Sequence, residues 1–331
     1  MKVCVLGAGS WGTALSMLAS LNNESVSLWT NEESVYKDIR ENGLNSYYTK
    51  ECPIPANVTV YLDIEEALCG AEFIIMAIPS QAVREVYGII KPYLSRGSVL
   101  LNAGKGLEAS TGLRNSQILT EVLGEYAADN AVFLSGPNLA LEFARKKPGC
   151  TLLASHNSEN AKLAQKVLSS EILRCYTATD VIGMELGGSL KNVMAIASGI
   201  STGLGFGFNA TSALLTRGLK EITRLGVFMG AKLETFYGLS GLGDMITTAT
   251  SDLSRNFRLG LRIAEGMTLE EAKDSLGQVA EGVPSCQAAM ILSEKFNIEM
   301  PITAEVYKIL FEGKDPHSAV KDLMLRDFKE E

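Results

Sequence analysis

Lys191 is the side chain in this sequence best suited to move a proton. It stands in the stretch GGSLKN (187–192), inside a mostly apolar run with helical spacing. Two glycines one turn before the lysine let another backbone, or a ligand, approach this helix face closely. Burial there disfavours the charged ammonium, which suits a general acid or base. The alternative is a solvated lysine beside glycines that serve only helix packing.

The stretch GAGSWG (7–12) fits the pattern GxGxxG. It follows a predicted strand and opens a helical pattern, and in that context the motif indicates dinucleotide binding. Gly7 permits the tight turn, Gly9 leaves room for a pyrophosphate, and Gly12 lets the helix pack on the strand. The free N–H groups at the start of the helix attract phosphates. The alternative is a tight turn that binds no ligand.

The two histidines are poor candidates for catalysis. His156 lies in a polar stretch, and His317 follows a proline near the C-terminus. Both positions are typical of solvated surface residues. A dehydrogenase of the lactate or malate type, which uses a histidine base, is therefore disfavoured.

Two further glycine-bearing loops follow predicted strands. Lys105 lies in NAGKG (102–106), and Gly136 and Asn138 lie in GPN (136–138). Ligands bind at the carboxyl ends of parallel strands in sheets of this kind. Either loop could be a plain turn, but two at the same predicted edge favour a ligand site.

The stretch SRN (254–256) offers a hydroxyl, a planar cationic fork and an amide, which suit a phosphate. Because Arg258 and Arg262 lie nearby, the alternative is an exposed basic helix face. Asp244 ends the glycine turn GLGD (241–244). It is either the N-cap of the next helix or the carboxylate that orients the candidate lysine.

The first half of the chain alternates continuous apolar runs with helical patterns. This alternation predicts a Rossmann-type, doubly wound parallel sheet, and a capping box at Asp63 and Glu66 opens one further helix. The strands are expected at Val3–Leu6, Val26–Trp29, Phe73–Ile78, Val99–Leu101, Val132–Leu134 and Thr151–Ala154. Helices are expected near Trp11–Leu21, Glu32–Glu41, Gln81–Ile90, Gly112–Leu123 and Ala161–Leu168.

From Asp180 onward the pattern is helical, with no convincing strand. A second capping box, at Thr268 and Glu271, opens a helix that Gly277 is suited to end. We therefore expect an α/β protein with two domains. Residues 1–179 would form the dinucleotide-binding domain, and residues 180–331 an all-helical substrate and catalytic domain.

Composition narrows the class of protein. The net charge of −8 argues against a nucleic-acid partner, so an anionic substrate would need locally placed Lys or Arg. The 6 cysteines form no CxxC pair, and no histidine stands at ligand spacing from one, so we expect reduced thiols and no metal site. Since there is no signal peptide and no apolar run near the roughly 20 residues of a membrane span, we expect a cytoplasmic protein.

Together these motifs resemble the bacterial NAD(P)-dependent glycerol-3-phosphate dehydrogenase family over nearly the whole chain. The order and spacing of the stretches match the family throughout. The stretches are GAGSWGTAL (7–15), NAGKGLE (102–108), LSGPNLA (134–140), ELGGSLKNVMAIASGI (185–200), LTRGLKEITRLG (215–226), GLSGLGDMITTATSDLSRN (238–256), GQVAEGV (277–283) and EMPIT (299–303).

The resemblance implies hydride transfer between NAD or NADP and C2 of dihydroxyacetone phosphate, with Lys191 as proton donor and acceptor at the C2 oxygen. The direction would be reduction, which supplies glycerol 3-phosphate for phospholipid synthesis, and the family suggests a homodimer. The substrate would contact Lys105, Gly136, Asn138, Lys191, Asp244, Ser254, Arg255 and Asn256. The cofactor would contact Gly7, Gly9, Ser10, Trp11, Gly12, Asn31, Lys105, Ala140, Arg255, Val279 and Glu281.

Two other functions remain open. One is a dehydrogenase of the 6-phosphogluconate or β-hydroxyacid type, which also pairs a nucleotide fold with a helical domain and a catalytic lysine. The SRN triplet and the GLGD turn count against it. The other is a non-catalytic dinucleotide sensor, which would not need Lys191, Asp244 and Arg255 together.

The residues after the second predicted strand bear on the choice between NADH and NADPH. A carboxylate there accepts from the ribose 2′-OH of NAD, whereas an arginine favours the 2′-phosphate of NADP. Asn31 is uncharged, Glu32 and Glu33 are expected in the first helical turn, and Lys37 and Arg40 lie further along. We therefore expect both cofactors to be used, with a preference below about tenfold.

Overall fold

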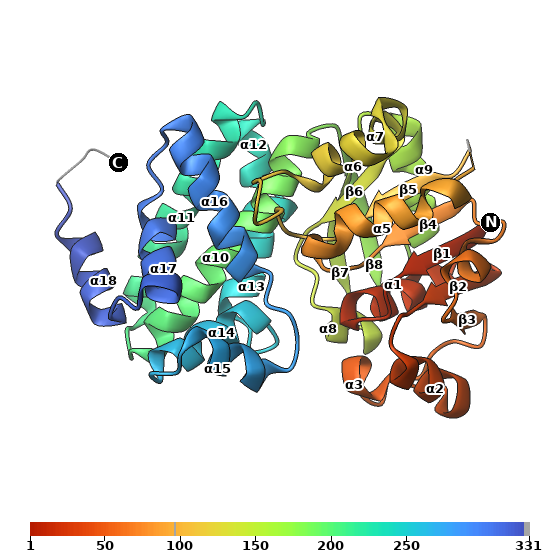
Figure 1. The fold of residues 1–331 in the computed structure, drawn as a ribbon, viewed down its shortest axis with the longest axis horizontal. Helices are drawn as coiled ribbons and strands as arrows, with labels where there is room; N and C mark the ends of the chain where they lie inside the picture. The colour runs from red at the N-terminus through yellow and green to blue at the C-terminus, as the bar shows by residue number, and fades with distance from the viewer. Residues whose placement is uncertain (96, 328–331) are drawn as a thin grey trace. The chain divides into compact units, whose positions relative to one another are not determined.

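The computed structural model describes residues 1–95 and 97–327, which form two compact units (Figure 1). Unit 1 contains Met1–Lys105 and Arg114–Glu185. Unit 2 contains Gly106–Leu113 and Leu186–Glu331, of which residues 328–331 lie outside the described part. A short segment directly after Lys105 thus belongs to the second unit, and the chain then returns to the first.

Unit 1 is built on one eight-stranded sheet with the order β3-β2-β1-β4-β5-β6-β7-β8. The order places β1 between β2 and β4, with consecutive strands added outward on both sides, so the sheet is doubly wound. The strands are β1 (Lys2–Leu6), β2 (Ser25–Trp29), β3 (Val58–Tyr61), β4 (Phe73–Met76), β5 (Val99–Asn102), β6 (Val132–Ser135), β7 (Gly149–Ala154) and β8 (Leu173–Ala178).

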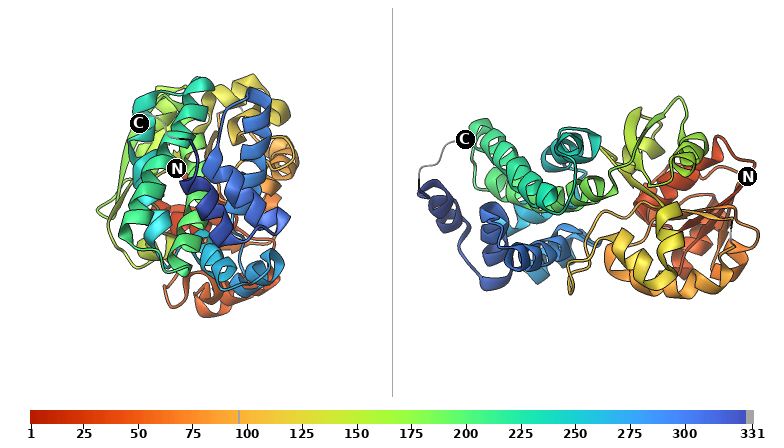
Figure 2. Two further views of the ribbon diagram at one scale, coloured as in Figure 1. Left: turned by 90° about the vertical axis from the view of Figure 1, so that its left-hand side faces the viewer. Right: turned by 90° about the horizontal axis from the view of Figure 1, so that it is seen from above.

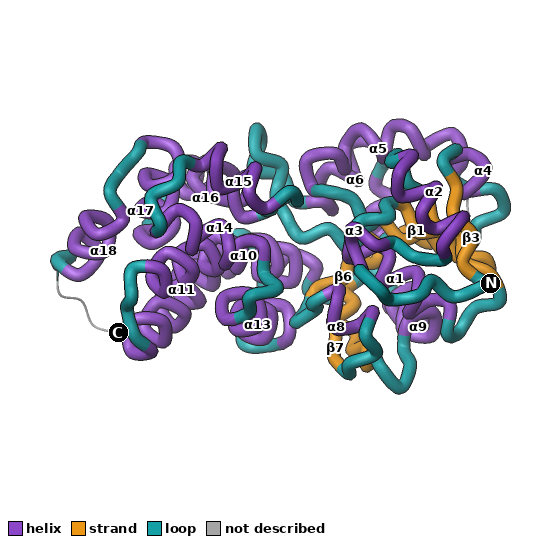
Figure 3. Tube along the Cα trace, turned by 90° about the horizontal axis from the view of Figure 1, so that it is seen from below, coloured by secondary structure: helices purple, strands orange, loops and turns teal. Residues whose placement is uncertain are grey.

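Helices cover both faces of this sheet, with α5 and α6 on one face and α1 and α9 on the other (Figure 3). Phe73, Ile75 and Leu101 are fully buried in the core between the sheet and helices α1 and α9. The helical segments of unit 1 are α1 (Ser10–Ser20), α2 (Glu33–Asn42), α3 (Ser46–Thr49), α4 (Ile64–Leu68), η1 (Ser80–Ala82), α5 (Val83–Ile90), η2 (Lys91–Tyr93), α6 (Asn115–Leu123), α7 (Glu125–Asn130), α8 (Ala140–Ala144) and α9 (Ser158–Leu168).

The predicted Rossmann-type sheet is confirmed, but the sequence interpretation missed its two edge strands, β3 and β8. Continuous apolar runs identify strands buried on both faces. At the edges only alternate side chains are buried: Leu173 and Cys175 of β8 point inward while Arg174 and Tyr176 are exposed. Such half-buried strands carry the weaker alternating pattern.

The expectation of a wholly parallel sheet is wrong at one pair, because β6 and β7 are antiparallel. All the other neighbouring strands are parallel. The connection between β6 and β7 contains only α8, a helix of 5 residues. A helix that short rises less than the strand it follows, so it cannot carry the chain back to the starting edge.

Between Val181 and Met324 the structure contains helices and connecting loops but no strand, as predicted (Figure 2). The capping box at Thr268 and Glu271 is confirmed, and Gly277 ends that helix in the left-handed conformation at φ +61°. Helix α10 begins in unit 1 and continues through unit 2. The segments are α10 (Val181–Gly203), α11 (Phe208–Phe228), α12 (Leu233–Phe236), η3 (Leu239–Gly243), α13 (Asp244–Thr250), α14 (Arg255–Ala264), α15 (Leu269–Leu276), α16 (Gly282–Phe296), α17 (Pro301–Glu312) and α18 (Pro316–Met324).

Two of the stretches that carry the resemblance meet in one contact of unit 2. Glu221 of α11 is 1% exposed, and its carboxylate accepts from the backbone N–H groups of Ile302 and Thr303 at 2.9 and 3.0 Å. The Thr303 hydroxyl donates to the same group at 2.6 Å. Glu221 therefore caps the N-terminus of α17. This contact gives a structural role to one residue of LTRGLKEITRLG and to the end of EMPIT.

Three findings bear on the expectations about membrane spans, cysteine thiols and histidines. No helix in the described part is long and apolar enough to cross a membrane. All 6 cysteines are free thiols, and burial raises the pKa of the Cys4 thiol to about 12 and that of Cys175 to about 11. His156 and His317 are both exposed.

Candidate active site

The glycine loop of unit 1 has the geometry of a phosphate cradle. Gly7 lies at φ +104°, and its N–H donates to the carbonyl of Trp29 at 3.0 Å. A Cβ added to Gly12 would lie 1.8 Å from the carbonyl oxygen of Gly7, so the start of α1 packs directly on the turn. A Cβ added to Gly9 would meet no described atom within 4 Å. The loop is thus tight on its protein side and open at Gly9.

Helix α1 begins at this opening. Gly9 is its N-cap residue, and no described side chain caps the helix. Ser10 and Trp11 supply the first N–H groups of the helix, which suit an anion. The residues present therefore fit the pyrophosphate of a dinucleotide.

Asn45, which the sequence interpretation missed, fixes the loop from outside. It is 1% exposed and donates to the carbonyl of Ala8 at 2.8 Å and to the hydroxyl of Thr13 at 2.9 Å. No local sequence signal marks this residue, because it follows the loop by more than thirty residues. Asn31, which leaves the end of β2, is exposed.

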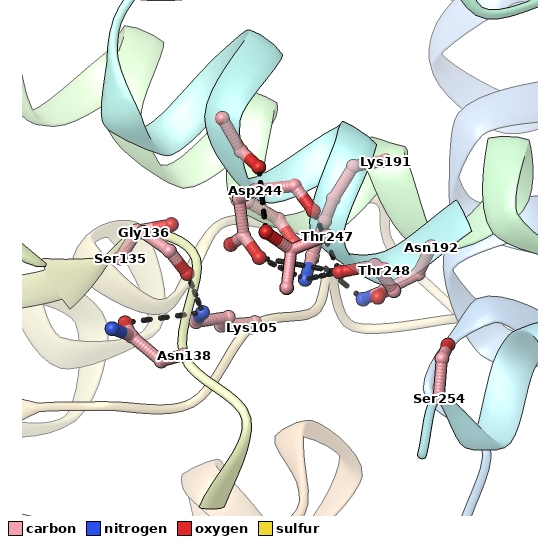
Figure 4. Close-up of polar contacts among 12 residues, drawn as sticks. Lys105, Ser135, Gly136, Asn138, Lys191, Asn192, Asp244, Thr247, Thr248 and Ser254 are labelled. Atoms are coloured by element: carbon pink, nitrogen blue, oxygen red, sulfur yellow. Dashed lines mark hydrogen bonds and ion pairs between the residues drawn. The ribbon is translucent and has the colours of Figure 1, made fainter. Parts of the chain in front are cut away.

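The two glycine-bearing loops predicted to share one sheet edge do converge (Figure 4). Because β5 and β6 are neighbours in the sheet, Lys105 reaches the loop after β6. Its ammonium donates to the carbonyl of Gly136 at 2.7 Å and lies 3.5 Å from Oδ1 of Asn138. Thr151 of β7 also donates to that Oδ1, at 3.0 Å. Ala140 begins α8 shortly afterwards.

Two buried asparagines hold the Lys105 loop in place. Oδ1 of Asn102 accepts from the backbone N–H of Gly104 at 2.8 Å, and Asn115 donates to the Gly104 carbonyl at 3.2 Å. Asn102 also donates to the hydroxyl of Tyr87 at 2.8 Å. Burial raises the pKa of that phenol, which keeps it neutral. The lysine therefore extends from a rigid loop.

In unit 2, Lys191 is buried and paired. Its side chain lies on α10 at 5% residue exposure, and Nζ donates to Oδ1 of Asp244 at 2.5 Å and to the hydroxyl of Thr248 at 2.6 Å (Figure 4). Asp244 is the first residue of α13, whose N-cap residue is Gly243. Of the two roles open to Asp244, the structure has the contact with Lys191.

Thr248 was missed by the sequence interpretation, although a signal existed. It stands four residues after Asp244 on the same helix, so both side chains share one face. The hydroxyl donates to the Asp244 carbonyl at 2.7 Å while it accepts from Lys191. Carboxylate and hydroxyl together fix the direction of the ammonium.

A close backbone contact brings these helices together. A Cβ added to Gly187 would lie 2.8 Å from the carbonyl oxygen of Ser240, in the π-helical segment η3. A Cβ added to Gly241 would lie 2.1 Å from the carbonyl oxygen of Phe236. The glycine before Lys191 therefore serves the approach of another backbone, which delivers Asp244.

The SRN triplet plays several structural parts. Ser254 is the N-cap residue of α14 and accepts from the N–H of Phe257 at 3.2 Å. Asn256 donates to Oδ1 of Asn192 at 2.9 Å and accepts from the N–H of Gly282 at 2.9 Å. Arg255 is partly exposed at the start of the helix. Asn256 thus ties α10, α14 and the start of α16 to one another.

The remaining candidate residues lie near the start of α16 and along α14. Glu281 is the N-cap residue of α16, and Val279 is 50% exposed. Arg262 is exposed and pairs with Glu265 at 2.8 Å, whereas Arg258 is partly buried. The alternative of a single exposed basic face therefore does not describe all three arginines of α14.

A doubly wound sheet with a glycine loop at its first turn, together with a buried lysine–carboxylate pair in a helical unit, defines a nicotinamide-dependent dehydrogenase. Residues 2–161 match the family model for the N-terminus of NAD-dependent glycerol-3-phosphate dehydrogenase, and residues 180–321 match the model for its C-terminus. The chain belongs to this family.

Individual relatives agree over the full length. The chain is 45% identical to a glycerol-3-phosphate dehydrogenase [NAD(P)+] of Thermoanaerobacter sp., covering 100% of this chain and 99% of the relative. It is 46% identical to the one of Carboxydothermus hydrogenoformans, covering 100% and 98%. The crystal structure of glycerol-3-phosphate dehydrogenase from Coxiella burnetii is similar with a TM-score of 0.93 at 38% identity, covering 98% of this chain and 99% of that one.

Two glycine variants separate a cofactor cradle from a plain turn. Because a Cβ at Gly9 meets no described atom within 4 Å, Gly9→Ala should keep the melting temperature of the ligand-free protein while it obstructs the pyrophosphate. We expect its Kd for NADH, measured by fluorescence titration, to rise about tenfold or more. Gly12→Ala should lower the melting temperature, because its Cβ would overlap the Gly7 carbonyl. Unchanged NADH binding in Gly9→Ala would contradict the cradle.

Proposed function

We propose that this protein interconverts dihydroxyacetone phosphate and sn-glycerol 3-phosphate, with Lys191 as the acid and base at the C2 oxygen. The observation that carries the proposal is the buried Lys191 ammonium, paired with Asp244 at 2.5 Å. When bound, NADH or NADPH supplies a hydride from C4 of its nicotinamide. The direction is reduction, which supplies glycerol 3-phosphate for phospholipid synthesis.

The residues of this chain contribute by placing a positively charged proton donor, Lys191, at the C2 oxygen of the substrate. Lys191 holds the proton that the C2 oxygen needs as negative charge develops there, a contribution typically worth about 10²–10⁴ in rate. Asp244 and Thr248 keep the ammonium oriented and charged, so its direction needs no reorganisation during the reaction. Once the proton is given up, the lysine must regain one from solvent before the next turnover.

Substrate recognition is assigned to cations and their neighbours. Arg255 offers the planar fork that suits a phosphate, and Lys105 offers a point charge held by the Gly136 carbonyl of the neighbouring loop. Further groups for the substrate are Gly136, Asn138, Asp244, Ser254 and Asn256. The amide of Asn256 is engaged with Asn192 and Gly282, so we assign it the task of holding the α14 segment in position.

Cofactor binding is assigned mainly to the first domain, residues 1–179, and substrate binding and catalysis to residues 180–331. Glycine-loop geometry supports the first assignment, and the Lys191 pair supports the second. A cytoplasmic location is part of the proposal. The residues assigned to the cofactor are Gly7, Gly9, Ser10, Trp11, Gly12, Asn31, Lys105, Ala140, Arg255, Val279 and Glu281.

The assay that tests the function also separates it from the 6-phosphogluconate or β-hydroxyacid type and from a sensor. We expect NADH absorbance to fall with dihydroxyacetone phosphate, and far more slowly with the oxo acids that dehydrogenases of the hydroxyacid type reduce. Arg255→Lys should raise the KM for dihydroxyacetone phosphate about tenfold or more, because an ammonium cannot reproduce the fork. It should also lose discrimination against unphosphorylated dihydroxyacetone. A wild-type protein that binds NADH but turns over none of these substrates would establish the sensor instead.

We also propose that the chain forms a homodimer through the N-terminal half of α11. The buried residues of this helix all lie at or after Gly218, while Phe208 at its start is 93% exposed. In the same half Leu214 and Leu215 are only partly buried, so this half leaves apolar side chains accessible to a partner protein. The chain's family resemblance makes a second copy the natural partner.

Light scattering tests the assembly. We expect a mass of twice the 35.6 kDa chain, and a shift toward the single-chain mass in Phe208→Ser. Tyr126→Ser, which removes another aromatic ring that is 67% exposed, is the matched control and should stay dimeric. A wild-type protein of single-chain mass would refute the dimer, and a dimeric Phe208→Ser variant would refute this surface.

A further inference from the structure

The segment after β2 runs beside the glycine loop. The Trp29 carbonyl accepts from the N–H of Gly7, so the chain leaves β2 next to the expected pyrophosphate position. Thr30 is 2% exposed, and its hydroxyl accepts from the backbone N–H of Glu32 at 3.1 Å. This local hydrogen bond turns the chain at the end of β2 and fixes the position of the Glu32 backbone.

Glu32 does not lie in the first turn of the following helix, where the sequence interpretation placed it. Helix α2 begins at Glu33, and Glu32 is its N-cap residue with extended backbone angles of φ −97° and ψ 107°. No described side-chain cap forms there. The carboxylate of Glu32 is therefore not used up by the helix, and the premise for a weak cofactor preference no longer holds.

A tyrosine from a distant segment orients this carboxylate. The hydroxyl of Tyr48 donates to Oε1 of Glu32 at 2.8 Å. Tyr48 lies on α3, next to Asn45, which is itself bonded to the glycine loop through Ala8 and Thr13. The same short segment thus anchors both the phosphate cradle and the acidic group after β2.

The cations of α2 are engaged along their own helix. Lys37 pairs with Glu33 at 2.6 Å, four residues before it. The guanidinium of Arg40 lies 5.6 Å from the centre of the Tyr36 ring and 3.3 Å from its hydroxyl. Neither Lys37 nor Arg40 is bonded to Glu32. The carboxylate of Glu32 at the end of β2 is therefore not neutralised by a cation of α2.

We propose that Glu32, held by Tyr48, accepts the ribose 2′-OH of NADH and excludes the 2′-phosphate of NADPH, so that this chain selects NADH. A carboxylate at the end of the second strand, 20 residues after the last glycine of the loop, stands where this fold binds the adenosine ribose. A 2′-phosphate there would meet a like charge in a position that Tyr48 prevents from swinging away. The proposal rests on the proposed nicotinamide-dependent function.

The expected preference is about a hundredfold or more in kcat/KM with dihydroxyacetone phosphate, equivalent to about 2.7 kcal/mol. The Kd values of NADH and NADPH, measured by fluorescence titration at one salt concentration, should differ in the same direction. Glu32→Gln should narrow the ratio to about tenfold or less, chiefly through better binding of NADPH. Tyr48→Phe keeps the charge but releases its position, so its ratio should fall between the two.

Glu33→Gln is the matched control, since it removes an adjacent exposed carboxylate that pairs with Lys37, and its ratio should equal that of the wild type. Equal affinity of the wild type for both cofactors would overturn the proposal, as would a Glu32→Gln variant with an unchanged ratio. Because Kd is measured without turnover, a protein that prefers NADH but reduces no substrate would refute the proposed function and leave this inference standing.

Discussion

The buried ammonium of Lys191, on the long helix α10, requires a carboxylate beside it, and several features of unit 2 meet that requirement. Removing either partner of such a pair would leave an uncompensated charge, at a cost of about 3–5 kcal/mol. The close approach of η3 to Gly187, the turn before Asp244 and the helical spacing of Thr248 all bring oxygen atoms to Lys191. The pair is costly for stability, which is why its presence points to chemistry.

Unit 1 meets a different constraint, which is to bring backbone N–H groups close to phosphate without a side chain in the way. Its first turn is closed at Gly12 and open at Gly9. Buried asparagines hold the two loops through hydrogen bonds to the backbone. Asn45 holds the first loop, and Asn102 holds the loop of Lys105. Polar groups that hold a loop from inside the protein keep the binding surface itself free for a ligand.

Local sequence patterns predicted what local physics controls. Strands buried on both faces, helix caps and the glycine loop were recognised because their signals lie within a few residues. The edge strand β8 was missed because only alternate residues are buried. Strand β7 was predicted, but its antiparallel direction depends on the short connection through α8, which no local pattern marks. The contacts that position the site were not predictable in the same way. Asn45, Tyr48 and Asn256 act on residues far away in the chain.

The central claim is that Lys191 and Asp244 act as one acid–base unit. A double-mutant cycle on kcat for dihydroxyacetone phosphate reduction at saturating NADH tests it most directly, with melting temperatures to verify folding. We predict that Lys191→Met lowers kcat by about 10²–10⁴, that Asp244→Asn also lowers it, and that the double variant loses no more than Lys191→Met alone. Losses that multiply, or a Lys191→Met variant with near wild-type kcat, would contradict the account.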